Sequence, residues 1–577
     1  MVATAPTLSQ AAFALKRERT SPDLAHFRRL YPETVANLGT LPRREEWLRA
    51  VWELDERWRA ATETRGGEAR AEEVVVRGAP PAGARAEAEF DVVYAGGVVG
   101  LLHAAVLACR FGRRVLVLDE AASAPRGEGG WNVSEDELRE LEAAGVFTRD
   151  EIEAAVVNRG RGGFVKFHDA SSRVKAEPLW VGGVLDVALD AERLLASAAA
   201  RVRGREGCAV VARTRFVRVY VERGRVTVEA AGPQGAPRFF GARLFMDATG
   251  EDSAVARQLS GGRAPTHVCP TVGTVARGFV RGGERDEVDF AAGDILASTE
   301  DACDHRQLVW EGFAGASGRD EYTTRLFFYD AVDSPADKSL LALFERYFER
   351  LPAFKRRGAH WRVERPLFAY AQGSGHAGRG RLRRARAGED RVMSLGADAP
   401  SGALAPRGFG AHLRHLGRLA HMTELALDAD MLDAAALAEV SAVGPRAAQA
   451  AGLAEFLRHA PQSAPSSVNE TLNALMAALH RLDDGVRREL FQGRLSFGAL
   501  RKLFGHTAVL YPRIFTRVRE HLGAGGALWW LAEIAETVWS ERRGRAAARG
   551  GVEAEGPRQR FARYAALYRN GGGAGGA

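Results

Sequence analysis

Cysteine is scarce in this sequence, and no metal-ligand pattern is present. The 577 residues include four cysteines, Cys109, Cys208, Cys269 and Cys303, which lie far apart. No CxxC pair and no cluster of cysteine with histidine occurs, so the sequence predicts neither a zinc nor an iron–sulfur site. The wide spacing also gives no disulfide framework, and a reducing compartment suits such a chain best. We therefore expect no metal and a cytoplasmic location.

Long apolar runs are missing as well. No stretch of about 20 apolar residues occurs, so the sequence predicts no helix that spans a bilayer. The opening "MVATAPTLSQAAFALKRERTSPDLAHF" lacks the uninterrupted apolar segment of a signal peptide. The net charge is +7, but acidic residues are interspersed with the basic ones and no basic face or nucleic-acid-binding module is visible. We expect no nucleic-acid partner, although a basic chain also suits an anionic membrane surface.

Hydrophobic patterns divide the chain into five predicted segments. Residues 1–88 form a helical extension and a Gly/Ala/Pro linker, and residues 89–265 alternate between strand and helix patterns. Residues 266–385 are rich in strand patterns. Residues 386–430 combine one more strand with a helix, and residues 431–577 are helical with a Gly-rich tail. The predicted class is α/β, with a Rossmann-like domain, an antiparallel β domain and helical extensions at both ends.

The most informative stretch is "DVVYAGGVVGLLHAAVLA", residues 91–108. Its small residues follow the G-x-G-x-x-G pattern of a dinucleotide-binding turn, with Ala95 in place of the first glycine and Gly97 and Gly100 in the other two places. An alanine is tolerated at the first place where φ is negative, and Gly96 supplies additional backbone freedom. The helix that follows would direct its amino terminus at a phosphate group.

Acidic residues stand at the end of the next predicted strand. The segment "RRVLVLDE" ends in Asp119 and Glu120, about 20 residues past the turn, where a carboxylate binds a ribose diol. These residues alone also allow a second interpretation, an ordinary buried strand–helix–strand unit that binds no cofactor. His103, on the intervening helix, is predicted to be structural. The hairpin-like segment "RFVRVYVERGRVTVEAAG" is predicted to turn at Arg223 and Gly224.

In two later segments an apolar strand also ends in a turn that contains aspartate and glycine. In "LFMDATGEDS" an apolar strand ends in a tight turn, and "RVMSLGADAPSGALAPRGFGAHL" combines a strand end, a Gly-rich loop and a helix. This order of segments resembles FAD-dependent enzymes with the glutathione-reductase-like or p-hydroxybenzoate-hydroxylase-like fold, and NAD(P)-only Rossmann enzymes lack the last two. The cofactor contacts predicted from these segments are Asp247, Thr249, Gly250, Gly396, Asp398, Gly408, Phe409 and Gly410.

Collinear stretches over about residues 28–540 resemble one narrower family, the CruA-type lycopene cyclases with their CruP-like relatives. The segments that begin "WNVS" at Trp131 and "CPTVG" at Cys269 carry most of the resemblance, because generic flavoproteins lack them. Other similar stretches are "LYPETVANLGTLP", "LDVALDAERLL", "DATGEDSAVARQLSGGR", "RGFGAHLRHLGRL" and "LFQGRLSFGAL".

Two positions depart from the family pattern. Gly130 replaces an acidic residue that usually precedes the "WN" pair, and Asp398 is shifted by one position from the usual Gly-Asp. The resemblance implies that residues 89–265 and 386–430 form the FAD-binding domain and that residues 266–385 form the substrate domain. It further implies cofactor contacts from Arg126, Trp131, Asn132 and Arg193.

The family reaction is the redox-neutral cyclisation of lycopene or a related linear carotenoid to β-type end rings. The resemblance implies reduced FAD, NAD(P)H as a candidate reductant, and an acidic side chain that protonates a terminal double bond. Anionic reduced flavin would stabilise a nearby carbocation in a dry pocket. The candidate acids are Asp330, which follows the apolar strand "TTRLFFY", and Glu364 in "WRVERPLFAYA". A structural role at a strand end or in a salt bridge is the alternative interpretation for both carboxylates.

A carotenoid substrate dissolves in the bilayer. Residues 503–543 mix apolar side chains, Trp529, Trp530 and arginines, which suits either an interfacial helix pair or a packed helical domain. We therefore expect peripheral association with the cytoplasmic side of the inner membrane, and the sequence predicts no particular oligomeric state. Two other functions stay open: a redox flavoenzyme such as a monooxygenase, desaturase or reductase acting on an isoprenoid or other apolar substrate, and a non-catalytic pigment- or flavin-binding homologue.

Overall fold

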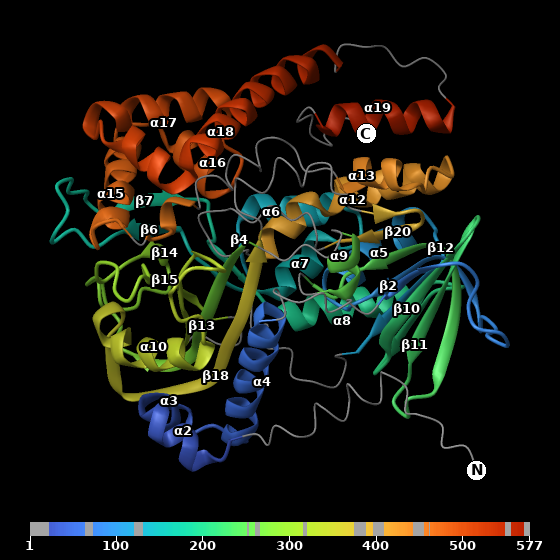
Figure 1. The fold of residues 1–577 in the computed structure, drawn as a ribbon, viewed down its shortest axis with the longest axis horizontal. Coiled ribbons are helices and arrows are strands. Elements are labelled where there is room, and N and C mark those ends of the chain that lie inside the picture. Colours follow the sequence, from blue (N-terminus) through green and yellow to red (C-terminus); the bar gives the residue numbers. More distant parts are fainter. Residues whose placement is uncertain are drawn as a thin grey trace.

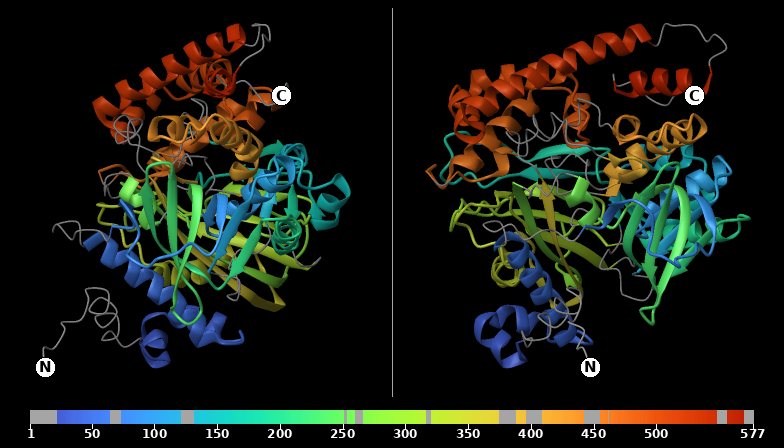
Figure 2. Two further views of the ribbon diagram at one scale, coloured as in Figure 1. Left: turned by 90° about the vertical axis from the view of Figure 1, so that its right-hand side faces the viewer. Right: turned by 45° about the vertical axis from the view of Figure 1, so that its right-hand side comes forward.

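Two large sheets lie side by side, and helices from both ends of the chain cover them (Figure 1). The computed structural model describes residues 22–63, 73–120, 131–250, 253–259, 266–315, 320–373, 388–395, 409–441, 455–460, 462–547 and 556–569. The turned views show the amino-terminal helices below the second sheet and the carboxyl-terminal helices above both sheets (Figure 2).

The first sheet has nine strands within the described residues. Its strands in spatial order are β1 (Val75–Arg77), β10 (Arg215–Glu222), β11 (Arg225–Ala231), β12 (Pro237–Asp247), β2 (Glu89–Ala95), β3 (Val115–Asp119) and β9 (Ala209–Ala212), with β20 (Val392–Ser394) beside the end of β12 and β19 (Gly388–Glu389) beside β20. Strands β9, β3, β2, β12 and β20 run parallel, so their carboxyl ends meet at one edge. The hairpin of β10 and β11 turns at Arg223 and Gly224, as predicted.

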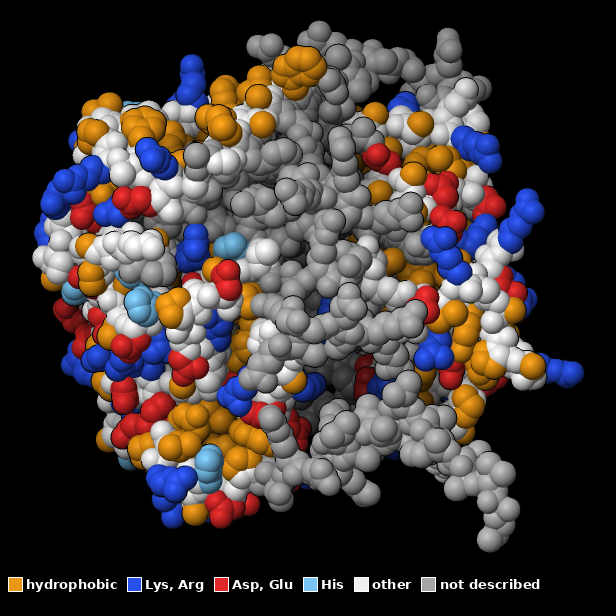
Figure 3. Space-filling view, in the orientation of Figure 1, with side chains coloured by type: hydrophobic (Ala, Val, Ile, Leu, Met, Phe, Trp, Pro, Cys, Tyr) orange, Lys and Arg blue, Asp and Glu red, His pale blue; other side chains and the backbone are white. Residues whose placement is uncertain are grey.

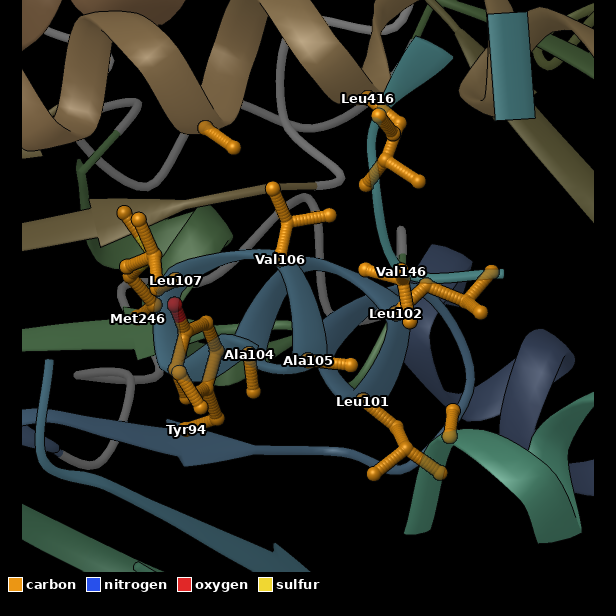
Figure 4. Close-up of a cluster of buried hydrophobic side chains, with 14 of the residues drawn as sticks. Tyr94, Leu101, Leu102, Ala104, Ala105, Val106, Leu107, Val146, Met246 and Leu416 are labelled. Atoms are coloured by element: carbon orange, nitrogen blue, oxygen red, sulfur yellow. The ribbon is translucent and has the colours of Figure 1, made fainter. Parts of the chain in front are cut away.

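The strand–helix–strand unit predicted from the Gly-rich turn is present. Helix α5 (Val99–Arg110) connects β2 to the parallel β3. Its residues from Leu101 to Ala108 are all buried, because α5 packs between the sheet and other helices. Figure 4 shows this cluster, in which residues of α5 gather with Tyr94 and Met246 of the sheet and with Val146 and Leu416. The other helices over this face are α6 (Glu135–Ala143), α7 (Arg149–Ala155), α8 (Ala191–Arg203), α12 (Phe409–Asp428), α13 (Ala434–Ser441) and α19 (Pro557–Arg569), and α9 (Ala254–Leu259) lies against the opposite face.

The second sheet has eight strands within the described residues. In spatial order they are β17 (Asp330–Ala331), β13 (His267–Phe279), β16 (Glu321–Phe327), β15 (Val309–Ala314), β14 (Gly293–Ala297), β6 (Gly162–Lys166) and β7 (Leu179–Gly182), and β18 (Arg357–Gly373) pairs with the other edge of β13. Strands β6 and β7 come from within residues 89–265, which the sequence analysis assigned to the FAD-binding domain. They join the second sheet because β6 pairs in parallel with β14.

One face of the second sheet packs against an aromatic core. Helix α10 (Leu340–Phe354) lies on this face, and Tyr347 on α10 contacts Trp310 of β15. The amino-terminal helices α2 (Leu24–Leu30), α3 (Pro32–Leu38) and α4 (Arg44–Glu63) extend the same core. Asp55 of α4 caps α10, since its carboxylate accepts hydrogen bonds from the N–H groups of Leu340 and Leu341 at 2.8 and 3.2 Å.

A small third sheet joins the two large ones. It consists of β4 (Trp131–Val133), β8 (Val187–Leu189) and β5 (Val156–Arg159). The carboxyl-terminal helices are the 3-10 helix η2 (Glu455–Leu457), α15 (Ser467–His480), α16 (Asp484–Phe491), α17 (Phe497–Leu510) and α18 (Ile514–Ala547). Helix α18 is interrupted at Gly523, whose φ is +66°. Among the described helices, none combines the length and apolar character that crossing a bilayer requires.

Candidate cofactor site

The predicted cofactor residues of the Gly-rich turn, the end of β3 and the turn after β12 lie at the carboxyl ends of neighbouring parallel strands. Ala95 at the end of β2 lies opposite Leu118 of β3 on one side and Asp247 of β12 on the other. Asp247 in turn lies opposite Ser394 of β20. Ligands of open parallel sheets bind outside the carboxyl ends of the strands, where neighbouring connections leave in opposite directions. The chain therefore brings three distant segments together at the place where such a site is expected.

The backbone of the turn shows why an alanine is tolerated at its first position. Ala95 still belongs to the extended strand β2, and the sharp change of direction falls on Gly96, whose φ is +102°. A Cβ built on Gly96 would lie 2.2 Å from the carbonyl oxygen of Ala248, so this position requires glycine. The left-handed residue has moved one place along the chain relative to the usual pattern.

The two remaining glycines allow two close approaches. A Cβ on Gly97 would lie 2.7 Å from Oδ1 of Asp119, and a Cβ on Gly100 would lie 2.8 Å from Cβ of Ala248. Because residue 97 has no side chain, its backbone is uncovered next to Asp119 at the end of β3. The glycine at position 100 allows α5 to pack closely against the turn after β12. Val98 at the start of α5 has no side-chain oxygen that could accept a hydrogen bond from the first N–H groups of the helix. These are the requirements of a turn that binds a pyrophosphate.

The acidic candidates differ in what they contact. Asp119 ends β3 and is buried beside Gly97, whereas Glu120 is exposed. Asp247 is fully buried, and its carboxylate accepts hydrogen bonds from the N–H and Oγ1 of Thr249 at 3.1 and 2.6 Å and from Oγ of Ser394 at 2.8 Å. Asp247 thus holds the turn after β12 against β20. The sequence analysis missed Ser394, whose role depends on a partner 147 positions away.

The turn that contains Gly250 is open. Gly250 has a φ of +109°, and a Cβ built on it would have no atom within 4 Å. Of the later candidates, Phe409 and Gly410 begin α12, which crosses above the sheet. Four of the predicted contacts lie outside the described residues: Arg126, Gly396, Asp398 and Gly408.

The "WNVS" segment is attached to helix α12. Trp131 and Asn132 lie in β4, opposite Leu189 and Ala188 of β8, and Trp131 is buried. The segment ends where α6 begins, and the N–H of Ser134 there donates to the Glu137 carboxylate at 2.6 Å.

The same carboxylate, that of Glu137, forms an ion pair with Arg414 of α12. Burial lowers the pKa of the Arg414 guanidinium, and the charge of Glu137 acts against that effect. Arg193 lies on the exposed side of α8, near its first turn.

The two predicted acids, Asp330 and Glu364, both form hydrogen bonds or ion pairs with neighbouring residues. Asp330 is buried, and its carboxylate accepts hydrogen bonds from the N–H of Ala331 at 2.8 Å and from the Ser334 hydroxyl; Lys338 Nζ lies 3.5 Å away. Glu364 on β18 is one-third exposed and pairs with Arg362 at 2.9 Å. Whether either residue donates a proton stays a prediction.

One titratable residue that the sequence analysis did not select is Glu311 on β15. Its side chain is 2 % exposed, and the closest cation is Arg325 of β16, 3.7 Å away. Burial raises the pKa of Glu311 to about 8. A lone acidic residue within the apolar strand "LVWEGFA" is the signal that would have identified it. Within the described residues, no group of three or more histidine, cysteine, aspartate or glutamate side chains is arranged to hold a metal ion.

The chain is similar in fold to solved structures of several flavoproteins. Halogenase PltM, in a complex with ethyl mercury and mercury, matches with a TM-score of 0.50 and 15% identity over 83% of this chain and 95% of that chain. p-Nitrophenol 4-monooxygenase PnpA from Pseudomonas putida matches with a TM-score of 0.48 and 16% identity over 71% and 99%. A geranylgeranyl bacteriochlorophyll reductase-like protein from Thermoplasma acidophilum matches with a TM-score of 0.48 and 14% identity over 75% and 98%.

The match to halogenase PltM, with a TM-score of 0.50, shows a shared fold. No protein-family model matches the chain, and no curated protein matches it. The predicted fold class is confirmed: this chain has the α/β fold of the p-hydroxybenzoate-hydroxylase type, with helical extensions.

Proposed function

We propose that this protein is a FAD-dependent enzyme. The observation that carries the proposal is the meeting of the Gly-rich turn, the buried Asp119 and the turn after β12 at one edge of the parallel sheet. The bare backbone of Gly97 would approach the pyrophosphate, and the first turn of α5 would direct its N–H groups at it. Asp119 would bind the ribose of the adenosine half.

The local geometry fits a dinucleotide better than an ordinary core. A buried strand–helix–strand unit without a ligand has no need for a glycine at position 97, because an alanine side chain there would add apolar contact. Here a Cβ on Gly97 would instead collide with Asp119. The position is therefore kept free of a side chain next to a carboxylate, which is what recognition of a ribose and a phosphate requires.

For the reaction, we propose the redox-neutral cyclisation of lycopene or a related linear carotenoid. This proposal is supported by the resemblance of the "WNVS" and "CPTVG" segments to the lycopene cyclases. Reduced FAD, when bound, would supply a negative charge that stabilises a nearby carbocation. The residues of the chain would have to hold the polyene, exclude water and provide one acid. The alternative is an oxidoreductase or monooxygenase acting on an isoprenoid or other apolar substrate, which would use the same cofactor site.

One experiment separates these reactions. The purified protein is loaded with FAD, reduced under anaerobic conditions and incubated in D₂O with lycopene in liposomes. Cyclisation gives a product that carries one deuterium per ring, and the reduced flavin is not consumed. An unlabelled or oxygenated product, formed with stoichiometric oxidation of flavin or NAD(P)H, would establish the oxidoreductase instead. Failure of the pure protein to bind FAD would overturn both proposals.

We also propose that the protein takes its substrate from a membrane surface. Five side chains of α17 and α18 are more exposed than any other large apolar side chain in the described residues: Val509, Phe515, Leu528, Leu531 and Trp539. Hydrophobic side chains gather along this edge of the molecule (Figure 3). The exposed Arg501, Lys502, Arg513 and Arg519 lie on the same two helices or between them. Basic and apolar side chains together suit an anionic lipid surface.

A further inference from the structure

The second sheet packs against a different cluster of buried side chains on each of its two faces. Thr274 of β13 and Thr324 of β16 each form a 2.6 Å hydrogen bond with the hydroxyl of Tyr347 on α10, so their side chains point into the aromatic core. Successive side chains of a strand point to opposite faces. The neighbouring residues Gly273 and Arg325 therefore belong to the face away from α10.

The strand register identifies the other members of this second face. Glu311 lies opposite Arg325, which lies opposite Gly273, and side chains of directly opposed residues share a face. Two residues earlier in each strand, Thr271 precedes Gly273 on β13 and Thr323 precedes Arg325 on β16. We call this the polar face after its members Thr271, Gly273, Glu311, Thr323, Arg325 and Arg365, and the apolar side chains of Cys269, Val309 and Phe327 share it.

The polar face adjoins the FAD-fold part of the chain. Arg365 on β18 lies opposite Val275, and the charge of Glu192, in the first turn of α8, acts on the pKa of the Arg365 guanidinium against the lowering by burial. Glu192 precedes Arg193, one of the predicted cofactor contacts. Thr271 and Gly273 come from the "CPTVG" segment, which the sequence analysis found specific to the resembling family. The charge of Glu192 thus links the Arg365 end of the polar face to α8 of the FAD-fold part.

Glu311 differs from the buried carboxylates that stabilise the fold. Asp55, for example, accepts hydrogen bonds from the hydroxyls of Ser339 and Tyr370, each at 2.7 Å, in addition to the N–H groups of α10. Around Glu311 the charged or titratable groups are Arg325, 3.7 Å away, and the buried thiol of Cys269 on β13. Among the described residues, the charge of Arg325 acts against the effect of burial but does not outweigh it, and the pKa of Glu311 is raised to about 8, so its protonated form is favoured at neutral pH.

We propose that Glu311 is the proton donor of the reaction, and this assignment rests on the proposed cyclisation. The O–H bond of Glu311 breaks and a C–H bond forms at the terminal double bond of the polyene, which leaves a tertiary carbocation. An internal double bond attacks the cation and closes the ring. The ring then loses a proton to the Glu311 carboxylate, which restores the acid, and no electrons leave the substrate. Arg325 stabilises the carboxylate while it is ionised.

The test compares Glu311→Gln with Glu321→Gln. Glu321 is a matched control, because it is also buried on β16 of the second sheet but has a close partner, Arg277 at 2.7 Å. We expect both variants to bind FAD, as shown by flavin absorbance. Glu311→Gln should lose about 100- to 10,000-fold in turnover, as removal of a general acid does, whereas Glu321→Gln should keep its turnover.

An infrared measurement tests Glu311 without any turnover. The carbonyl band of a protonated carboxylic acid should disappear as the pH is raised through about 8, and this change should be absent in Glu311→Gln and present in Glu321→Gln. If the wild-type protein cyclises lycopene and Glu311→Gln does so equally fast, the assignment of Glu311 is wrong and the proposed function stands. If the wild-type protein with FAD makes no cyclised product, the proposed function fails and the assignment fails with it.

Discussion

Gly97 and Asp119 lie so close that a Cβ on Gly97 would come within 2.7 Å of Asp119 Oδ1 and 2.9 Å of Oδ2. Such a distance is well below a normal carbon–oxygen contact, so a side chain at residue 97 would require the carboxylate of Asp119 to move from its position. The glycine and the carboxylate therefore form one unit of the candidate site, although 22 positions separate them in the sequence.

The first prediction concerns this pair. Gly97→Ala should displace the Asp119 carboxylate and weaken FAD binding at least 10-fold, and Asp119→Ala should weaken it to a similar extent by removing the ribose contact. Titration of the apoprotein with FAD, followed by flavin fluorescence, measures both changes. Gly498→Ala is the matched control, because a Cβ at that helical position meets no atom within 4 Å. Unchanged affinity in both site variants would reject the turn as a FAD site.

A second prediction uses a buried histidine of α5. His103 is fully buried, Tyr94 forms a 2.8 Å hydrogen bond to its Nδ1, and burial lowers the pKa of His103 from 6.5 to about 4. Since the folded protein then binds fewer protons than the unfolded chain between pH 6.5 and 4, stability is complete above pH 6.5 and decreases as the pH falls through this range. The loss amounts to about 3 kcal/mol.

Urea denaturation at a series of pH values measures this effect. His103→Asn retains a side chain that can bond to Tyr94 but does not titrate, so its stability should fall less steeply than that of the wild type between pH 6.5 and 4. His480→Asn, which changes an exposed histidine, should follow the wild-type curve. Parallel curves for the wild type and His103→Asn would show that His103 is not the group responsible.

The third prediction separates the two buried carboxyl groups of the second sheet, Asp330 and Glu311. Asp330→Asn removes a carboxylate that lies 3.5 Å from the buried Lys338 ammonium, which leaves that charge with hydrogen bonds alone. We expect a loss of about 1–3 kcal/mol of unfolding free energy with turnover largely kept. If Asp330→Asn instead loses turnover and keeps its stability, Asp330 is the proton donor, as the sequence analysis predicted, and Glu311 is not.

The elements that the sequence predicted well are those set by local patterns. The hairpin that turns at Gly224 and the strand–helix–strand unit around Gly100 both depend on residues that lie close together in the sequence. Periodicity and glycine positions carry that information directly.

The features that the sequence did not predict depend on distant pairings. Strand β6 joins β14 across about 130 positions, and Ser394 binds Asp247 across 147. A pattern within one segment carries no information about its partner. Glu311 was missed although the sequence carries a signal, one acidic residue within an apolar strand, and the fold adds that this side chain is buried with Arg325 3.7 Å away.

The last prediction concerns the membrane. Leu528, Leu531 and Trp539 lie on α18 at spacings of 3 and 8 residues, so they project from one side of the helix. Their exposed fractions are 69, 58 and 62 %, and Val509 and Phe515 nearby reach 78 and 67 %. An apolar stripe of this size is costly to leave in water, and an interfacial position on a membrane would bury it in lipid.

Replacement of Leu528, Leu531 and Trp539 by serine should therefore abolish binding to vesicles of phosphatidylglycerol in a flotation assay while FAD stays bound. Leu30→Ser removes a single exposed leucine of α2, 48 % exposed, and should leave binding unchanged. Because basic side chains lie on the same helices, binding should also weaken in high salt and on vesicles of phosphatidylcholine. If the wild-type protein ignores both kinds of vesicle but forms dimers that the triple variant loses, the stripe binds a second copy of the chain, and the substrate must reach the enzyme by another route.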